Sequence, residues 1–159
     1  MQFTGGELSY WIGSFLWPLF RVGAMLGIAP ILGARVVPAR IRLGLAIAIT
    51  VVIVPLLPPA PAVDALSADA VLITANQLLI GLAMGFLLRL VFTAVEIAGQ
   101  IVGQLMGLGF ASMIDPENGV QVPVMSQYYS IMAILLFLAF NGHLLLIEMI
   151  VESFRRTST

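Results

Sequence analysis

Hydrophobic runs of roughly membrane-spanning length divide this chain, and short polar or proline-rich segments separate them. The runs are Leu8–Leu32, Leu43–Leu57, Ala70–Phe92 and Val122–Val151. A helix needs about 20 apolar residues to cross the hydrocarbon core of a bilayer, so the second run is short and the others suffice. The pattern predicts an all-α fold, a polytopic membrane protein of long helical hairpins.

Helix-breaking and capping residues set the expected ends of these helices. Pro18 is expected to kink the first helix and Pro30 to end it. Ser67 is placed to cap the helix that begins near Ala70. The last run would extend about 45 Å as one helix, longer than a bilayer core. We therefore expect the Asn-Gly-His sequence at 141–143 to bend or break it.

The distribution of arginine predicts an orientation for the first half. The connector 33–42 carries Arg35, Arg40 and Arg42 without any acid, so we expect it on the cytoplasmic side. The N-terminus and the loop 58–70 then face the other side, with Arg89 towards the cytoplasmic end. For the second half, the sequence leaves open whether residues 93–110 cross, re-enter or do neither.

Glycines and polar residues each recur every four positions in the segment 93–119, so each set lies along one helix face. The glycines are Gly99, Gly103 and Gly107, and the polar residues are Glu96, Gln100 and Gln104. The pairs Gly81 and Gly85, and Gly23 and Gly27, have the same spacing. Such small residues let membrane helices approach closely. Polar side chains in membrane helices usually face protein or a water path. We expect helix packing at the glycines and protein or water beside the polar stripe.

An apolar stretch that disfavours regular helix follows this segment. It comprises Met106, Gly107, Leu108, Gly109, Phe110, Ala111, Ser112, Met113, Ile114, Asp115 and Pro116. Its glycines are poor helix formers, and the sequence DPENG at 115–119 predicts a turn. Non-helical backbone at membrane depth is tolerated only where protein covers it or where it lines a cavity. We expect a broken, re-entrant-like loop near 107–119, and the residues alone leave two roles open: a seal and a packing loop.

Ionisable side chains lie within or at the edges of the apolar runs. They are Arg21, Arg89, Glu96, His143 and Glu148. An Asp, Lys or Arg facing lipid at a helix centre costs about 2.5–3.5 kcal/mol on insertion scales, so these groups need cover. Two explanations stay open: burial by other protein subunits, and pairing within the chain, for instance between Arg21 and Glu96.

The composition supports the membrane class and excludes several functions. Only 15 of the 159 residues are Asp, Glu, Lys or Arg, or 9% against about 25% in soluble domains. No basic patch is present to bind nucleic acid, and the absence of cysteine excludes thiol chemistry. His143 has no second metal-ligating residue near it in the sequence, and no phosphate-binding loop or nucleophile elbow occurs. We expect no metal, no cofactor and no enzymatic activity.

Several short motifs, taken in their order along essentially the whole chain, resemble the FliR/SctT family of type III export-gate membrane proteins. The resemblance is to the flagellar members of this family. The motifs are RVG at 21–23, AP at 29–30, VPARIRL at 37–43, GLAMGF at 81–86, AGQ at 98–100, GLGFAS at 107–112, DP at 115–116 and FLAFNGH at 137–143. Singly these motifs are weak, but in this order they are specific.

The resemblance implies a subunit of the flagellar export gate in the bacterial inner membrane, at the flagellar basal body. FliP and FliQ would form the pore with it, beside FlhB, and unfolded flagellar proteins would pass through. The loop 106–122 would help to plug the closed pore. Relatives continue beyond the equivalent of Phe154 with further hydrophobic helices, so we expect 1–159 to be one helical membrane domain that corresponds to their N-terminal part. The competing hypotheses are a small-solute transporter or channel fragment in contact with lipid, and a membrane scaffold without a gating role.

Overall fold

The computed structural model describes residues 5–30, 37–58, 63, 67–108, 112–114 and 121–157. Its elements in chain order are α1 (Gly5–Ile28), α2 (Ala39–Ile53), a 3-10 turn (Val54–Leu56), α3 (Ala68–Leu105), β1 (Ser112–Ile114), β2 (Gln121–Pro123), α4 (Val124–Ala139) and α5 (Gly142–Thr157). The two strands form a small antiparallel ribbon in which Met113 pairs with Val122. Helices make up nearly all of the described part, which confirms the predicted all-helical class.

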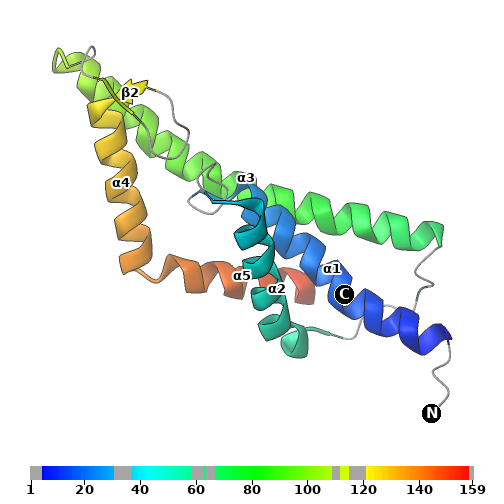
Figure 1. The fold of residues 1–159 in the computed structure, drawn as a ribbon. Helices are drawn as coiled ribbons and strands as arrows, with labels where there is room; N and C mark the ends of the chain where they lie inside the picture. Colours follow the sequence, from blue (N-terminus) through cyan, green and yellow to red (C-terminus); the bar gives the residue numbers. More distant parts are fainter. Residues whose placement is uncertain are drawn as a thin grey trace.

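Helix α3 is the longest element and runs the length of the molecule (Figure 1). Its 38 residues correspond to about 57 Å of helix. The expected end of the third helix at Phe92 was wrong, because no glycine or proline follows Phe92 until Gly99 and the helix continues to Leu105. The predicted cap is confirmed: the Ser67 side chain accepts a hydrogen bond from the backbone N–H of Ala70 at 3.2 Å.

The first two helices differ from their predicted bounds mainly at the start of α2. Helix α1 ends at Ile28, close to Pro30 as expected, and Pro18 lies inside the helix without ending it. Helix α2 begins at Ala39 rather than at Leu43, because the extended backbone at Pro38 (ψ 142°) ends there. Arg40 and Arg42, which we expected in a connector, therefore lie in the first turn of α2.

A small apolar core joins α1, α2 and α5. Its buried residues are Val22, Met25, Leu26, Ala46, Ile53 and Ile150. Outside this core, helices α2, α3 and α4 carry many exposed leucine, isoleucine and valine side chains along their lengths. Such an apolar exterior is expected of a chain that lipid or other membrane proteins surround.

The expected interruption at 141–143 is confirmed as a sharp corner between α4 and α5. The two helices meet at an angle of 68°, and Asn141 adopts a left-handed conformation with φ 55°. Asparagine tolerates this conformation better than most residues. The ring of Phe137 covers Gly142, where a Cβ atom would collide with it, and lies edge-on to Phe92 of α3, 5.5 Å between centroids.

Length and composition allow two of the helices to cross a membrane. They are α2 with its 3-10 extension (Ala39–Leu56) and α3. The bent pair α4 and α5 would provide a third span if the two helices together count as one broken span. The described helices therefore support a polytopic membrane protein.

Candidate functional site

The glycines of α3 form a contact seam, and its first half packs against α1. A Cβ atom at Gly85 would lie 2.6 Å from the carbonyl oxygen of Met25, and one at Gly81 would collide with the carbonyl oxygen of Arg21. Because the contacts advance in the same direction on both helices, α1 and α3 run parallel here. Only glycine allows the backbones to approach this closely.

The second half of the seam packs against α4, which runs antiparallel to α3. A Cβ atom at Gly99 would lie 2.9 Å from the Cβ of Tyr129 and 3.0 Å from the carbonyl oxygen of Met125. One at Gly103 would lie 3.0 Å from the Cβ of Met125. One continuous helix thus carries two packed contacts on one face, each built on a pair of glycines.

A hydrogen bond between helices fixes the register of the second contact. The hydroxyl of Ser126, which is buried, donates to the backbone carbonyl of Glu96 at 3.0 Å. Glu96 lies one turn before Gly99, so this bond and the glycine contact support the same alignment of α4. The sequence pattern does not indicate this role for Ser126, because a serine two residues after a helix start carries no signal of a distant partner.

Gly107 lies outside the seam, although its spacing placed it there. It has φ +75°, and a Cβ atom there would meet nothing within 4 Å. Its backbone N–H donates to the carbonyl of Gln104, and that of Leu108 donates to the carbonyl of Gly103 at 2.9 Å. This pair of bonds is a Schellman motif, in which a left-handed glycine ends a helix. Gly107 therefore terminates α3 and turns the chain away from it.

The pair Gly23 and Gly27 on α1 is likewise not a close contact. A Cβ atom at either position would meet nothing within 4 Å. The face of α1 that touches α3 presents the backbone at Arg21 and Met25 instead, so the pair is not packed within the described part of the chain. Its packing against another subunit stays a prediction.

The polar stripe lies beside the seam. Gln100 and Gln104 are exposed, and Glu96 is half-buried next to the α4 contact. The side chains of α1 and α4 thus leave the two glutamines uncovered. That protein or a water path lies beside the polar stripe stays a prediction.

The candidate loop begins and ends at the same end of the α3–α4 hairpin. Met106 and Leu108 are exposed just after α3, and the ribbon pairs 112–114 with 121–123, directly before α4. Gly109, Phe110, Ala111, Asp115 and Pro116 lie outside the described residues. The described stretches are non-helical, as expected for this segment.

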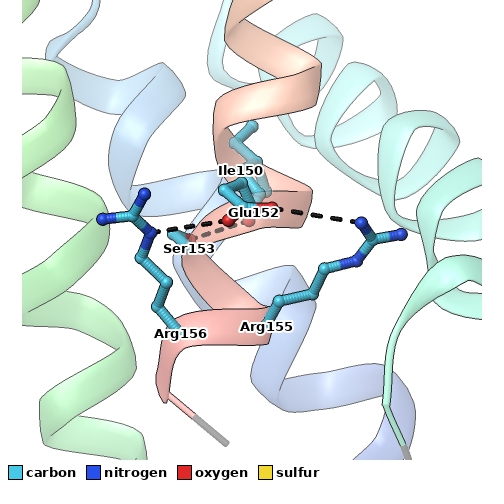
Figure 2. Close-up of polar contacts among 5 residues, drawn as sticks. All are labelled: Ile150, Glu152, Ser153, Arg155 and Arg156. Carbon is cyan, nitrogen blue, oxygen red and sulfur yellow. Dashed lines mark hydrogen bonds and ion pairs between the residues drawn. The ribbon is translucent and has the colours of Figure 1, made fainter.

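Arg21 is completely buried, and its contacts come from the far end of the chain. Its Nη1 donates to the hydroxyl of Ser153 at 2.8 Å, and its guanidinium carbon lies 3.7 Å from the ring centre of Phe154. We had suggested Glu96 as a partner, whereas these contacts tie α1 to α5. Ser153 donates in turn to the carbonyl of Ile150 at 2.7 Å (Figure 2).

The other charged candidates are on the surface of the described part. Arg89, His143 and Glu148 are exposed. Near the end of α5, Glu152 lies between Arg155 and Arg156, 3.4 Å from the Nε of Arg156 (Figure 2). Glu152 and Arg156 lie four positions apart on one helix face, and an exposed pair of this kind contributes only about 0.3–0.5 kcal/mol. The described residues contain no cluster of three or more His, Asp or Glu that would hold a metal ion.

A family of known proteins matches nearly the whole chain. Residues 12–159 match the model of a family described as bacterial export proteins, family 1. The chain belongs to this export family. The match includes the whole glycine seam, the polar stripe, the loop and the α4–α5 corner, and the export family agrees with the expectation of a protein that is not an enzyme.

Individual relatives within export family 1 confirm the resemblance found in the motifs. The chain is 44% identical over 154 residues to the flagellar biosynthetic protein FliR of Escherichia coli K12, covering 97% of this chain and 59% of that protein. It is 35% identical over 154 residues to the FliR protein of Pectobacterium carotovorum, covering the same shares. It is 32% identical over 145 residues to that of Bacillus subtilis 168, covering 91% and 56%. The chain thus spans less than two thirds of the length of these relatives.

Proposed function

We propose that this chain is a membrane subunit of the flagellar protein export gate and forms its pore with FliP and FliQ, beside FlhB. Unfolded flagellar proteins would pass through this pore, in the bacterial inner membrane at the flagellar basal body. The observation that carries the proposal is the match to export family 1 over residues 12–159, with relatives named as flagellar biosynthetic proteins. The exposed apolar faces of α3 and α4 support it, since assembly with other membrane subunits would cover them.

Within that gate, the loop 106–122 is proposed to plug the closed pore. Two described features support a plug here. The Schellman motif at Gly107 ends α3 sharply, and the ribbon brings the chain back directly to the start of α4. Both ends of the loop are therefore held at one end of a hairpin that glycine contacts fix. A base of this kind fixes where the loop begins and ends relative to the two helices.

Deletion of Gly107–Ile114 tests the plug. We expect the membrane to become leaky to ions or small solutes while the subunit still assembles with its partners, because the deletion spares the glycine contacts at Gly99 and Gly103. Permeability is measured by dye or ion flux in cells, and assembly by co-extraction in mild detergent. Alanine at Leu144 and Leu145, exposed apolar residues of α5, serves as a control that should not leak. Unchanged permeability with intact assembly would contradict the plug.

A small-solute transporter or channel is the second candidate function. The exposed glutamines of the polar stripe favour it, since they would suit a binding path. Transporters of that kind usually contain paired broken helices from internal repeats, whereas the described part contains one bent pair, α4 and α5. Extraction of the chain as a monomer or homodimer would favour the transporter over the gate.

A further inference from the structure

The polar stripe of α3 is longer than its four-residue spacing indicated. Two further residues continue it towards the middle of the helix, so that the extended polar stripe comprises Arg89, Thr93, Glu96, Gln100 and Gln104. At about 100° per residue, all five lie within a sector of roughly 80° on one flank of the glycine seam. They extend over about 22 Å of the helix axis.

Three residues of this extended polar stripe, Arg89, Gln100 and Gln104, are left uncovered by the described part of the chain. No hydrogen bond or ion pair among the described residues involves the side chain of Arg89. Glu96 lies about 10 Å further along the axis, too far for an ion pair with Arg89. Arg89 therefore presents an outward positive charge that no described residue neutralises.

Lipid alone does not suit this surface at any depth. Helix α3 is about 57 Å long, so at a tilt below 40° it cannot lie wholly within a hydrocarbon core of about 30 Å. If residues 89–105 lie in the core, Gln100 and Gln104 face hydrocarbon without hydrogen-bond partners. If they lie outside it, Ile101 and Leu105 face water, with Leu105 83% exposed. Protein cover satisfies both requirements at once.

The spacing of the extended polar stripe indicates a helix as that cover. The first four residues of the extended polar stripe follow each other at intervals of four, three and four residues: Arg89, Thr93, Glu96 and Gln100. This is the seven-residue repeat with which two helices pack along a left-handed crossing. A second copy of this chain inserted in the same direction would place Arg89 against Arg89, and such like charges repel.

We propose that one transmembrane helix of a different export-gate subunit docks along the extended polar stripe. That helix presents an Asp or Glu carboxylate opposite Arg89 and hydrogen-bonding side chains opposite Gln100 and Gln104. An arginine accepts a carboxylate through two parallel hydrogen bonds, which fixes the register as well as the partner. The inference rests on the proposed function as a gate subunit and adds the docking face and the chemistry of its occupant.

Photocrosslinking from single cysteines tests the docking face, and residues 1–159 contain no cysteine that would compete for the label. Benzophenone-maleimide is attached to single-cysteine variants Gln100→Cys and Gln104→Cys in the membrane of the bacterium that makes the protein. Leu87→Cys and Val91→Cys, 63% and 62% exposed on the other side of α3, are the matched controls. We expect adducts from the stripe positions to a membrane helix of another protein, and mass spectrometry of the adduct to place an Asp or Glu opposite Arg89.

Charge reversal then tests the chemistry of the contact. Arg89→Glu should lower the adduct yield at Gln100→Cys by about tenfold or more, since like charges at an interface cost several kcal/mol. Exchange of the identified partner acid for Arg should restore it, and adducts at the control positions should not change. Arg89→Gln removes the charge and is less costly to insert into the membrane than Arg89→Glu; it should lower the adduct yield several-fold. An immunoblot checks that each variant chain is present.

Four outcomes would overturn the proposal: adducts only to lipid, adducts only to a second copy of the chain, an attached helix without an acid, and a yield that Arg89→Glu leaves unchanged. Secretion of flagellar proteins is measured in the same strains. This measurement distinguishes failure of the docking face from failure of the proposed function. Secretion that depends on the chain, together with any of these outcomes, overturns the docking face alone. A chain without any role in secretion overturns the gate.

Discussion

The close packing of α1 against α3 predicts that alanine changes the stability of the protein differently at two glycines. Each of the two belongs to a pair of glycines spaced four residues apart. Gly85→Ala would place a methyl group 2.6 Å from the carbonyl oxygen of Met25 and 3.3 Å from the Cβ of Ile28. Since such atoms normally keep about 3.5 Å or more apart, the two helices must separate by up to roughly 1 Å. Gly23→Ala, in the interior of α1, meets nothing within 4 Å.

The free-energy difference between the two variants isolates the cost of the contact. Both substitutions gain about 1 kcal/mol of helix propensity, because alanine replaces glycine inside a helix. Gly85→Ala also suffers an overpacking cost of about 1–3 kcal/mol, as in a packed core. The two variants should therefore differ by about 1–3 kcal/mol, with Gly23→Ala the more stable.

Unfolding in mixed micelles with increasing SDS measures this difference. Both tryptophans, Trp11 and Trp17, lie in α1, so intrinsic fluorescence reports directly on the helix that the substitution would displace. Equal stabilisation of the two variants, within about 0.5 kcal/mol, would refute the close approach of α1 and α3.

Three further predictions use the same unfolding measurement. Ser126→Ala removes the hydrogen bond to α3 and should cost about 0.5–1.5 kcal/mol, whereas Ser130→Ala, which has no such bond among the described residues, should be nearly neutral. Asn141→Val should cost about 1–2 kcal/mol through its left-handed conformation, and Asn141→Gly should be tolerated; equal losses would contradict the corner. Phe154→Leu should cost about 1–2 kcal/mol, because the guanidinium of Arg21 loses an aromatic ring in a desolvated site, and an unchanged stability would show that the stacking contributes nothing.

Features that depend on neighbours in the sequence were predicted well. The cap at Ser67, the end of α1 before Pro30 and the corner at Asn141 each follow from the backbone preferences of one or two residues. Helix was also expected on both sides of Phe92, but the sequence pattern did not show that the two segments form one continuous helix. The boundary expected there reflected bilayer thickness, which does not limit the length of a helix.

Features that depend on distant residues were beyond the sequence pattern. The spacing of Gly107 fits both a packing seam and a helix end, and only the position where α3 stops decides between them. Arg21 contacts Ser153, 132 positions away, and neither residue carries a signal of the other. The seam itself was predicted as a set of close contacts, but the pattern did not show that α1 occupies its first half and α4 its second.

The mass of the complex that contains this chain tests the central claim most directly. Membranes of the bacterium are extracted in a gentle detergent, the chain is purified through a tag, and the mass and composition of the particle are measured. The account predicts a particle that contains other membrane subunits of the flagellar export apparatus, FliP and FliQ among them. Recovery as a monomer or homodimer, under conditions that keep the membrane complexes of the cell intact, would contradict it.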